Sequence, residues 1–413
     1  MFLNKIYINH KHIACIMKSG ECIPEETIKK ISQQTKLPAH KLFHKICHHA
    51  PEVVIKENHY RKVLKLLKDR KKHMVVETAP SIRVSIGEEF GLEPGTIVLG
   101  KMVAALRECG FTKIFDTNLG ADIMVVEEAT ELLQRIKKKG PFPMITTCCP
   151  AWIRFMEHFY HDLIPNMSTC KSPHEMLGVL ARHYYADKHN VDKRNIVVVS
   201  IMPCTAKRYE SQRPELKSGV DYVLTTREAA KLIKHFRIDF NKLDDDAFDP
   251  ALGISTGAAA IFAATGGVME AAIRTAYELA SGKPIKNLEF KEMRGMKGVK
   301  QGTININGME LNCAAANGLS NARRLLRNAK DYHFIEIMAC PGGCIGGEGQ
   351  PLPRTKQKIQ KRIEALYMQD ADLPVRKSHE NPLVKQIYKE FLGKPGSSRA
   401  RNLLHSSYIK RKF

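Results

Sequence analysis

Short apolar runs alternate with stretches of helical periodicity along most of the chain, from His73 onward. Runs rich in Val, Ile, Phe and Met predict strands over Met74–Thr78, Lys113–Asp116, Phe142–Thr146, Ile196–Met202 and Phe334–Met338. Between them, apolar residues recur every three to four positions and predict helices over Leu99–Cys109, Glu127–Lys138, Ser172–Lys188 and Ala258–Ser281. This alternation is typical of an α/β fold whose sheets are mainly parallel and are flanked by helices.

The pattern changes at both ends of this α/β region. Residues 1–72 are rich in Lys and His and weakly patterned, apart from an amphipathic helix predicted near His59–Lys71. Residues 241–249 are acidic and polar and predict a surface loop, and from Pro351 onward the pattern is helical and basic. For 413 residues we expect two or three domains. We predict a basic N-terminal region over 1–72, a central α/β domain over 73–352 and a helical C-terminal segment over 353–413.

Neither a membrane span nor a secretory signal is visible in the sequence. No apolar run reaches the ~18–20 residues that a membrane helix needs. The apolar stretch near Ile13–Met17 lies between charged residues, and no small-residue cleavage site follows it. We therefore predict a cytoplasmic protein that does not bind a membrane.

The chain is strongly basic, with 65 Lys and Arg against 43 Asp and Glu and a formal net charge of +22. Such a charge favours a polyanionic partner and speeds association with it. The sequence contains no helix-turn-helix, zinc-finger or aromatic RNA-binding motif, so we do not expect nucleic acid to be that partner. An acidic protein satisfies the same electrostatics, and a well-solvated basic surface is the remaining alternative.

Three cysteine motifs carry the candidate chemistry. The chain has eleven cysteines, and a cytoplasmic protein uses cysteines as buried thiols, metal ligands or catalytic groups rather than as disulfides. Each motif directly follows a predicted strand: Thr146-Thr147-Cys148-Cys149-Pro150, Met202-Pro203-Cys204-Thr205-Ala206-Lys207 and Ala339-Cys340-Pro341-Gly342-Gly343-Cys344. Because loops at the carboxyl ends of parallel strands converge, these thiols can close around one metal centre.

The number of these cysteines favours an iron–sulfur cluster. Four Cys is the usual complement of a [4Fe–4S] cluster. Cys148 and Cys149 are adjacent and poorly placed to bind the same cluster together, which leaves four ligands and one free thiol. Two alternatives stay open: unrelated cysteines in the core, since free Cys is commonly buried, and a zinc site, for which only Cys340 and Cys344 have the usual spacing.

The three motifs, in this order, resemble the active-site signatures of the [FeFe]-hydrogenase family. The resemblance extends from about Thr78 to the C-terminus and includes the stretch from His379-Glu380-Asn381-Pro382 to Tyr408, which is similar to the family's small-subunit-like tail. It implies two α/β lobes that clamp an H-cluster, with 73–352 as the catalytic domain and 353–413 as a helical wrap. It also implies reversible reduction of protons to H₂, an acidic ferredoxin or similar electron carrier, and separate maturation proteins.

The same resemblance assigns roles to individual residues. The metal ligands of the [4Fe–4S] half would be Cys149, Cys204, Cys340 and Cys344, and Cys344 would also bridge to a diiron half that carries CO, CN⁻ and azadithiolate. Cys148 would be the terminal proton donor and acceptor. Lys207 and Ser81 would bind the two cyanides. The remaining cofactor-binding residues would be Ala79, Pro80, Met202, Met338, Phe262 and Pro173.

A proton route is needed between a buried site and solvent. Glu128, Glu131 and Arg135 are spaced by three and four residues on one predicted helix, so they share a face. The resemblance places Ser168 between this face and the site, and Glu210 beside Cys148. Titratable groups at hydrogen-bond intervals are what a relay requires. An ordinary surface ion pair on a helix is the alternative interpretation of the three helical residues.

The sequence departs from the family pattern at several positions. Glu348 stands where the glycine-rich run usually continues, and His174 stands where Gln is common, which leaves catalytic bias and rate open. Residues 1–72 offer only Cys15, Cys22 and Cys47, too few for a ferredoxin-like cluster, although a metal site there remains possible. Two other functions are alternatives: a hydrogenase-like H₂ sensor, and a non-catalytic iron–sulfur assembly factor.

Overall fold

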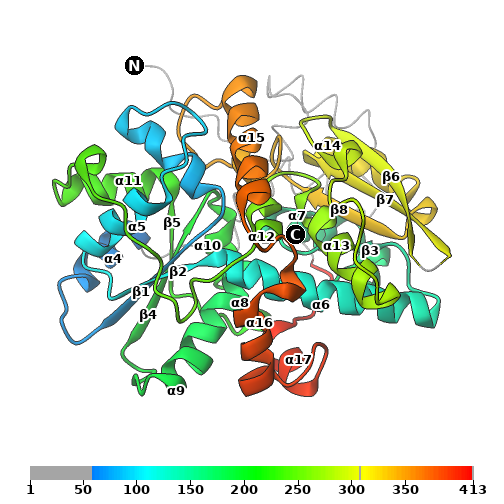
Figure 1. Cartoon of the computed structure of the whole chain (residues 1–413), viewed down its shortest axis with the longest axis horizontal. Coiled ribbons are helices and arrows are strands. Elements are labelled where there is room, and N and C mark those ends of the chain that lie inside the picture. Colours follow the sequence, from blue (N-terminus) through cyan, green and yellow to red (C-terminus); the bar gives the residue numbers. More distant parts are fainter. Residues whose placement is uncertain (1–57, 307, 412–413) are drawn as a thin grey trace.

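The computed structural model describes residues 58–411 apart from residue 307. Within these residues the fold contains two four-stranded sheets, one in each of two lobes (Figure 1). The first sheet has the order β2-β1-β4-β5 and is parallel throughout. Its strands are β1 (His73–Thr78), β2 (Lys113–Asp116), β4 (Ile196–Met202) and β5 (Tyr222–Thr225).

The second sheet is mixed and has the order β3-β8-β7-β6. β3, β8 and β7 are parallel, and β6 closes the edge as an antiparallel hairpin partner of β7. Its strands are β3 (Met144–Ile145), β6 (Val299–Ile306), β7 (Met309–Asn317) and β8 (Phe334–Met338). The α/β prediction with two lobes of mainly parallel sheet is therefore confirmed.

Helices cover both sheets and fill the space between the lobes (Figure 1). α6 (Thr117–Lys138) starts directly after β2 and continues under the second lobe, where it packs on α13. The other α-helices are α4 (His59–Leu66), α5 (Leu99–Glu108), α7 (Pro150–Phe159), α8 (Pro173–Leu180), α9 (Ala186–Lys188), α10 (Ala206–Glu210), α11 (Thr226–His235), α12 (Gly257–Ala260), α13 (Gly267–Ser281), α14 (Leu319–Leu326), α15 (Lys356–Asp372), α16 (Pro382–Ile387) and α17 (Ser398–Leu404).

Local sequence explains where several of these elements begin. β4 is buried over its whole length, as expected for a central parallel strand with helices on both faces. The Asp116 side chain accepts a hydrogen bond from the Asn118 amide and caps α6, and Thr225 and Glu228 form a capping box at α11. Glu336 of β8 accepts from the amides of Gly266 and Met269 at the start of α13, which ties this helix to the second sheet.

The strands predicted at β1, β2, β4 and β8 are confirmed, whereas β5, β6 and β7 were missed. The strand expected over Phe142–Thr146 is shorter, since Pro143 has no N–H to donate to a ladder. β6 was missed because its residues alternate between buried and exposed positions and form no apolar run. β7 ends in the small residues of Ala314–Asn317, which carry little strand signal.

Two helix predictions need correction. The single helix expected over Ala258–Ser281 is wrong, because the chain breaks between α12 and α13. Gly266 has a φ of +94°, and a Cβ there would lie 1.9 Å from the Met293 carbonyl oxygen. α6 begins ten residues before Glu127, at the cap that Asp116 provides. The helix over Ser172–Lys188 is present as α8 and α9 joined by a π-helical turn at Ala181–Tyr185.

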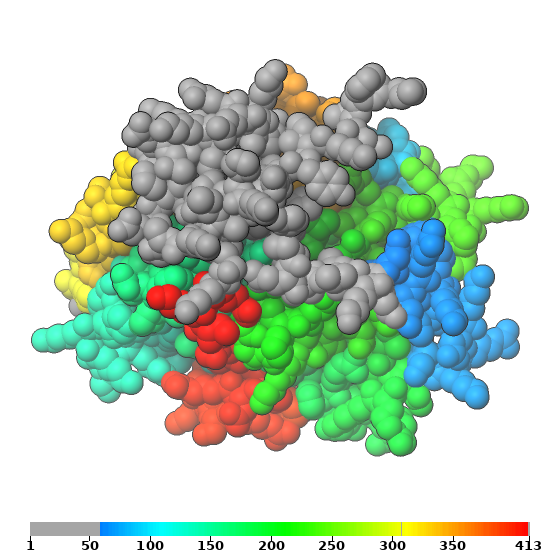
Figure 2. Space-filling view, turned by 180° about the vertical axis from the view of Figure 1, so that it is seen from behind, coloured from blue at the N-terminus to red at the C-terminus, as the bar shows by residue number. Residues whose placement is uncertain are grey.

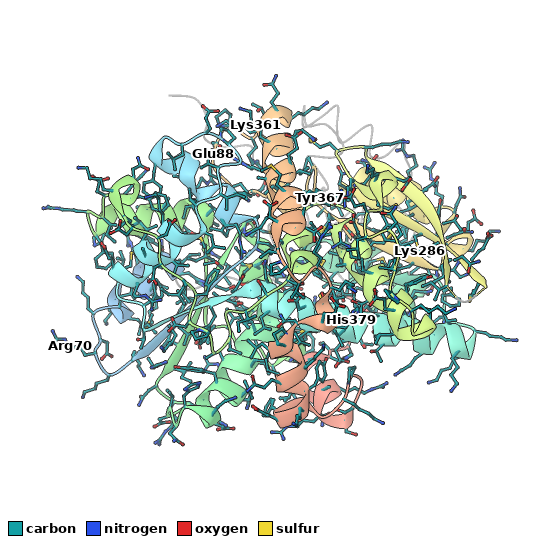
Figure 3. All side chains as sticks on the ribbon, viewed as in Figure 1. Arg70, Glu88, Lys286, Lys361, Tyr367 and His379 are labelled. Atoms are coloured by element: carbon teal, nitrogen blue, oxygen red, sulfur yellow. The ribbon has the colours of Figure 1, made fainter. Side chains whose placement is uncertain are left out.

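α15 runs from the top of the molecule toward its centre, between the two lobes, and contacts both (Figure 3). On one side, Glu88 of the first lobe accepts from Arg362 Nε at 2.6 Å and pairs with Lys358 Nζ at 3.0 Å. On the other side, Asp370 receives both terminal nitrogens of Arg274 from α13, each at 2.8 Å. Both Asp370 and Arg274 are fully buried, so this ion pair lies inside the structure.

The C-terminal residues then descend between the lobes. Seen from behind, they lie at the bottom centre, between the residues of α6 and those of the first lobe (Figure 2). Tyr388 donates to Glu127 of α6 at 2.6 Å, and His405 Nε2 lies 3.0 Å from the same carboxylate. The predicted boundaries at 72 and 352 stay predictions, and Cys15, Cys22 and Cys47 lie outside the described residues. Within residues 58–411, no helix has the length and apolarity to cross a membrane.

Candidate active site

A cavity with an empty volume of about 730 Å³ lies where loops from both sheets meet. Its wall is formed by loops that follow the carboxyl ends of β1, β3, β4 and β8, together with residues of α6 and α8. Parallel α/β sheets build their sites at this edge. The lining is nearly all apolar, so any charged group bound there would be shielded from water.

The three cysteine motifs converge on this cavity. Cys149 comes from the loop after β3, Cys204 from the loop after β4, and Cys340 and Cys344 from the loop after β8. All four line the cavity, and all but the slightly more open Cys344 are buried. Burial raises the pKa of Cys204 and Cys340, and Cys149 and Cys344 raise both further. The four thiols are therefore near neighbours.

The donor set fits an iron–sulfur cluster. Burial raises the pKa of Cys344 to about 12, and the charge of Cys149 adds to this rise. Four neighbouring thiolates in an apolar cavity would repel one another strongly, and only a bound cation makes that charge state stable. Four thiolates are the ligands that a [4Fe–4S] cluster uses.

The loop backbone approaches this cavity closely. Gly347 has no side chain, and a Cβ there would lie 2.3 Å from the Pro203 carbonyl oxygen. Gly343 has a φ of +102°, which side chains rarely adopt, and a Cβ would lie 2.7 Å from the Ala263 carbonyl oxygen. Glycine at these two positions lets the loop after β8 pack directly against the loop after β4, at Pro203, and against the segment between α12 and α13, at Ala263.

Lys207 is held in the cavity wall by charged hydrogen bonds. Its Nζ donates to the Cys148 carbonyl oxygen at 3.0 Å and to Glu210 Oε2 at 2.7 Å. His174 Nε2 lies 2.7 Å from the same Glu210 oxygen, and His174 Nδ1 lies 3.2 Å from Ser200 Oγ. Burial by itself raises the pKa of Glu210. The neighbouring Lys207 and His174 have the larger, opposite effect and lower this pKa to about 2. Glu210 is therefore an anion that anchors Lys207.

The remaining predicted cofactor residues also line the cavity: Ala79, Pro80, Ser81, Met202, Met338, Phe262 and Pro173. Ser81 is fully buried, and its hydroxyl has no hydrogen-bond partner among the described residues. A buried hydroxyl without a partner costs free energy unless a bound group satisfies it. Sequence reasoning missed further lining residues, among them Thr117, Ala121 and Ala263. Thr117 could have been predicted as a lining residue, because it directly follows the carboxyl end of a predicted parallel strand, β2.

The predicted proton route lies on α6, beside the cavity. Glu128 is fully buried, and neither carboxylate oxygen has a hydrogen-bond partner in the described structure. Burial raises the pKa of Glu128 to about 8 and Glu131 adds to the rise, whereas the nearby Ser168 hydroxyl lowers it. Burial also raises the pKa of Cys148, to which Cys344, Cys149 and Glu128 contribute. Both groups therefore hold a proton at neutral pH.

Glu131 lies at the outer end of this series. Its Oε2 accepts from Ser168 Oγ at 3.2 Å and from the Thr169 amide at 3.0 Å. Its Oε1 accepts from Arg135 at 2.7 Å, and Arg135 also donates to the carbonyl oxygen of Met167 at 2.8 Å. The three helical residues do share a face, and they contact the loop that carries Ser168.

Two protein-family models match this chain. Residues 72–348 match the model of the iron only hydrogenase large subunit, C-terminal domain, and residues 356–411 match that of the iron hydrogenase small subunit. The chain belongs to the iron-only hydrogenase family. Membership of this family implies an H-cluster as the cofactor.

Individual hydrogenases are similar over most of the chain. "NADP-reducing hydrogenase subunit HndD" of Solidesulfovibrio fructosivorans is 47% identical over 372 residues, and "Iron hydrogenase 1" of Clostridium pasteurianum is 46% identical over 367. These alignments cover 87% and 86% of this chain and 64% of each relative, so the chain spans about two thirds of their length. A solved [FeFe]-hydrogenase HydA, studied in stepwise H-cluster assembly, superposes with a TM-score of 0.77 at 38% identity, covering 86% of this chain and all of that one.

Iron–sulfur assembly factors are also similar to this chain, but more distantly than the hydrogenases are. The cytosolic Fe-S cluster assembly factors narfl of Danio rerio and Xenopus tropicalis are 27% and 28% identical to this chain. The chain is thus considerably more similar to hydrogenases than to these factors.

Proposed function

We propose that the chain is an [FeFe]-hydrogenase catalytic subunit that reversibly reduces protons to H₂ with electrons from a ferredoxin-type carrier. One observation carries this proposal: four cysteine thiols from three loops line one apolar cavity together with Cys148 and Lys207. In the proposed arrangement, Cys149, Cys204, Cys340 and Cys344 would hold the [4Fe–4S] half of the H-cluster, and Cys344 would also be its link to the diiron half. When bound, this group supplies the iron chemistry that combines protons and electrons into H₂.

The side chains around the cavity bind and orient that group. The Lys207 ammonium offers a compact positive charge to one cyanide, because Glu210 and the Cys148 carbonyl fix its position. The Ser81 hydroxyl, which has no protein partner among the described residues, offers a hydrogen bond to the other. Met202, Met338, Phe262 and Pro173 contribute apolar side chains to the lining and exclude water.

Proton transfer uses Cys148 and α6. Cys148 holds a proton at the cavity wall, and Glu128 holds a second one behind it, since burial keeps both groups neutral. Ser168 and Glu131 continue the series by a hydrogen bond of 3.2 Å, and Arg135 keeps Glu131 in place. Neighbouring groups at such intervals transfer protons by exchanging hydrogen bonds.

Electrons reach the [4Fe–4S] half from outside the catalytic domain. A formal charge of +22 supports an acidic carrier such as a ferredoxin. Glu348 is half-buried close to this half, and its charge contributes to the raised pKa of Cys340. Next to an anionic cluster, Glu348 would disfavour additional negative charge and so lower the reduction potential. Separate maturation proteins supply the diiron half, and the cytoplasm is the proposed compartment.

Infrared spectroscopy provides the test. Anaerobic protein, loaded with the iron–sulfur cluster and then with the diiron group, should show CO and CN⁻ bands and should evolve H₂ from reduced viologen. Cys204→Ser should lose these bands, whereas Cys313→Ser, at a buried thiol of β7 away from the cavity, should keep them. Bands without turnover would favour an H₂ sensor, and failure to take up the diiron group would favour an assembly factor.

A further inference from the structure

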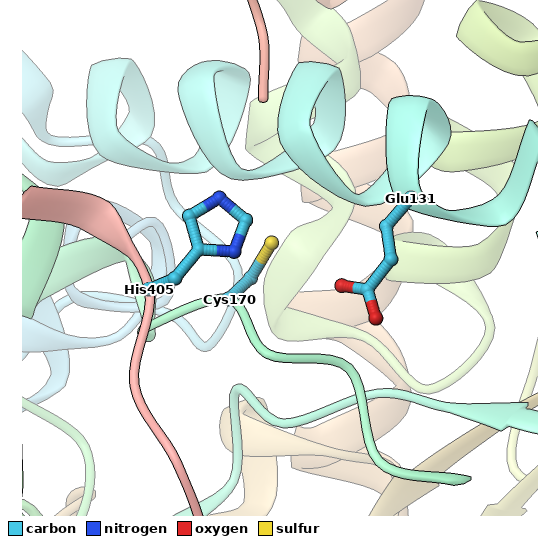
Figure 4. A group of neighbouring side chains, drawn as sticks. All are labelled: Glu131, Cys170 and His405. Atoms are coloured by element: carbon cyan, nitrogen blue, oxygen red, sulfur yellow. The ribbon is translucent and has the colours of Figure 1, made fainter. Parts of the chain in front are cut away.

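Cys170, Glu131 and His405 bring three metal-ligating side chains together at the outer end of the α6 series (Figure 4). They come from three separate segments: α6, the loop before α8, and the residue that follows α17. One ligand atom from each lies within 4.8 Å of those of the other two. Thiolate, imidazole and carboxylate are the ligands of Zn²⁺ and of similar divalent cations.

The backbone fixes two of these residues against each other. Cys170 and His405 form an isolated antiparallel bridge. The Lys171 amide donates to the Leu404 carbonyl oxygen at 2.8 Å, and the Ser406 amide donates to the Thr169 carbonyl oxygen at 2.8 Å. The thiol and the imidazole are therefore held together without a metal, which reduces the ordering that a cation would have to impose.

Hydrogen bonds orient the imidazole for metal binding. His405 Nε2 lies 3.0 Å from Glu127 Oε2, and that carboxylate also accepts from the Gly396 amide. A carboxylate at this distance fixes Nε2 as the protonated nitrogen, as carboxylates behind metal-bound histidines commonly do. The lone pair of Nδ1 then faces the other two ligands, where it accepts a hydrogen bond from Thr169 Oγ1 at 2.7 Å.

A cation at this position would displace the Thr169 hydroxyl proton that now lies between two of the ligands. Thr169 Oγ1 lies 3.2 Å from Glu131 Oε2 and 2.7 Å from His405 Nδ1, so it bridges these two ligands. Arg135 binds the other oxygen, Glu131 Oε1, so a cation would bind Oε2 and share it with the hydrogen bonds from Ser168 Oγ and the Thr169 amide. Thr169 is exposed, whereas the side chains of Glu131 and His405 are 14% and 11% exposed. Solvent cations therefore approach past Thr169.

The surroundings are negative. Burial is the main reason that the pKa of Cys170 is well above its ordinary value, and Glu131, Glu128 and Glu127 raise it further. The same negative potential attracts a cation, and a bound cation deprotonates a coordinating thiol. Because one ligand is sulfur, hard cations such as Mg²⁺ and Ca²⁺ are disfavoured.

We propose that Glu131, Cys170 and His405 bind one zinc-type divalent cation, with Thr169 or water as the fourth ligand. The site is distinct from the cavity between the lobes. Its functional consequence rests on the proposed function: a cation on Glu131 would occupy the carboxylate that passes protons to solvent, so binding should inhibit H₂ evolution reversibly.

Binding is measured first, without turnover, on full-length protein loaded with its cluster so that the four cavity cysteines are occupied. Competition with a chromophoric chelator should give one tight Zn²⁺ site, and crystals exposed to Zn²⁺ should show an anomalous peak between these three residues at the zinc edge. Cys170→Ala should lose the site, whereas Cys109→Ala, at another buried thiol, should keep it. Glu127→Gln should weaken binding by about 10–100-fold, the usual effect of losing a carboxylate behind a ligand.

His405→Gln is a second ligand variant that keeps the proposal testable if Cys170→Ala folds poorly. An anomalous peak elsewhere, or equal affinity in wild type, Cys170→Ala and His405→Gln, would overturn the site. Inhibition of H₂ evolution by Zn²⁺ that is relieved by chelator and absent in Cys170→Ala supports the consequence. Zn²⁺ bound at this site without inhibition would overturn the consequence alone. Protein that never evolves H₂ would instead refute the proposed function, because the binding measurement does not depend on turnover.

Discussion

Replacing Glu128 by Gln should remove a pH dependence from the stability of this protein. Glu128 is completely buried on α6 without a hydrogen-bond partner among the described residues, and burial raises its pKa to about 8 from an ordinary 4.5. Between these two values the folded protein keeps a proton that the unfolded chain has lost. The folded state then binds more protons, so the free energy of unfolding falls as pH rises.

The size of this effect follows from the two pKa values. A single proton gives a slope of up to about 1.4 kcal/mol per pH unit, and the whole range gives about 5 kcal/mol, as an upper limit. The contribution is fully present below pH ~4.5 and is lost once the pH passes about 8. Gln has the same shape and cannot ionise, so the variant lacks this slope. Asp122 and Glu336, whose burial raises their pKa to about 7, remain in both proteins and cancel in the comparison.

Urea unfolding, followed by fluorescence at several pH values between 5 and 8.5, measures this difference. Wild type should lose more stability than Glu128→Gln across that range, so that the variant becomes the relatively more stable protein at high pH. Glu310→Gln, at an exposed carboxylate on β7, is the matched control and should run parallel to wild type. Parallel curves for wild type and Glu128→Gln would refute the reasoning and with it the neutral Glu128 of the proposed relay.

Three further substitutions test other parts of the structure. Asp370→Ala should destabilise the protein by about 1–3 kcal/mol in urea unfolding, since it removes one of the two buried carboxylates that pair with Arg274 and leaves only Glu270, whereas exposed Asp372→Ala should have little effect. His174→Leu removes a donor to Glu210 and should raise its pKa from about 2 by one to two units, measured by ¹³C NMR of the labelled carboxyl, and an unchanged value would contradict the network. Ser81→Ala should leave the unloaded protein as stable as wild type but shift one CN⁻ infrared band after loading, and a spectrum identical to wild type would argue against the proposed contact.

The sequence predicted those parts of the fold that carry a strong local signal. β1, β4 and β8 are buried apolar runs, and the motifs after β4 and β8 lie where parallel strands should place them. β6 could not be recognised, because an edge strand exposes alternate residues and its pattern depends on the partner that it pairs with. The break before α13 did have a signal, the pair Gly266-Gly267, which was outweighed by the alanine-rich helical pattern on both sides.

The sequence motifs indicated which loops meet at the cavity, whereas contacts between distant segments carried no signal in the sequence. Spacing alone brought Glu128, Glu131 and Arg135 to one helical face. The bonds of His174 to Glu210 and of His405 to Glu127 join residues 36 and 278 positions apart. No periodicity in a single sequence encodes such pairs, because they arise only when separate loops are folded against each other.

The attachment of α15 to both lobes has a consequence for how the chain could be divided. Residues 352–355, which lead into this helix, are all exposed, and exposed loops tolerate cleavage. Beyond them, buried ion pairs to Glu88 and Arg274 hold the helix without help from the peptide link. Cutting the chain at this loop should therefore yield two polypeptides that remain associated through gel filtration. The fold would then not depend on the covalent connection between the catalytic domain and the C-terminal segment.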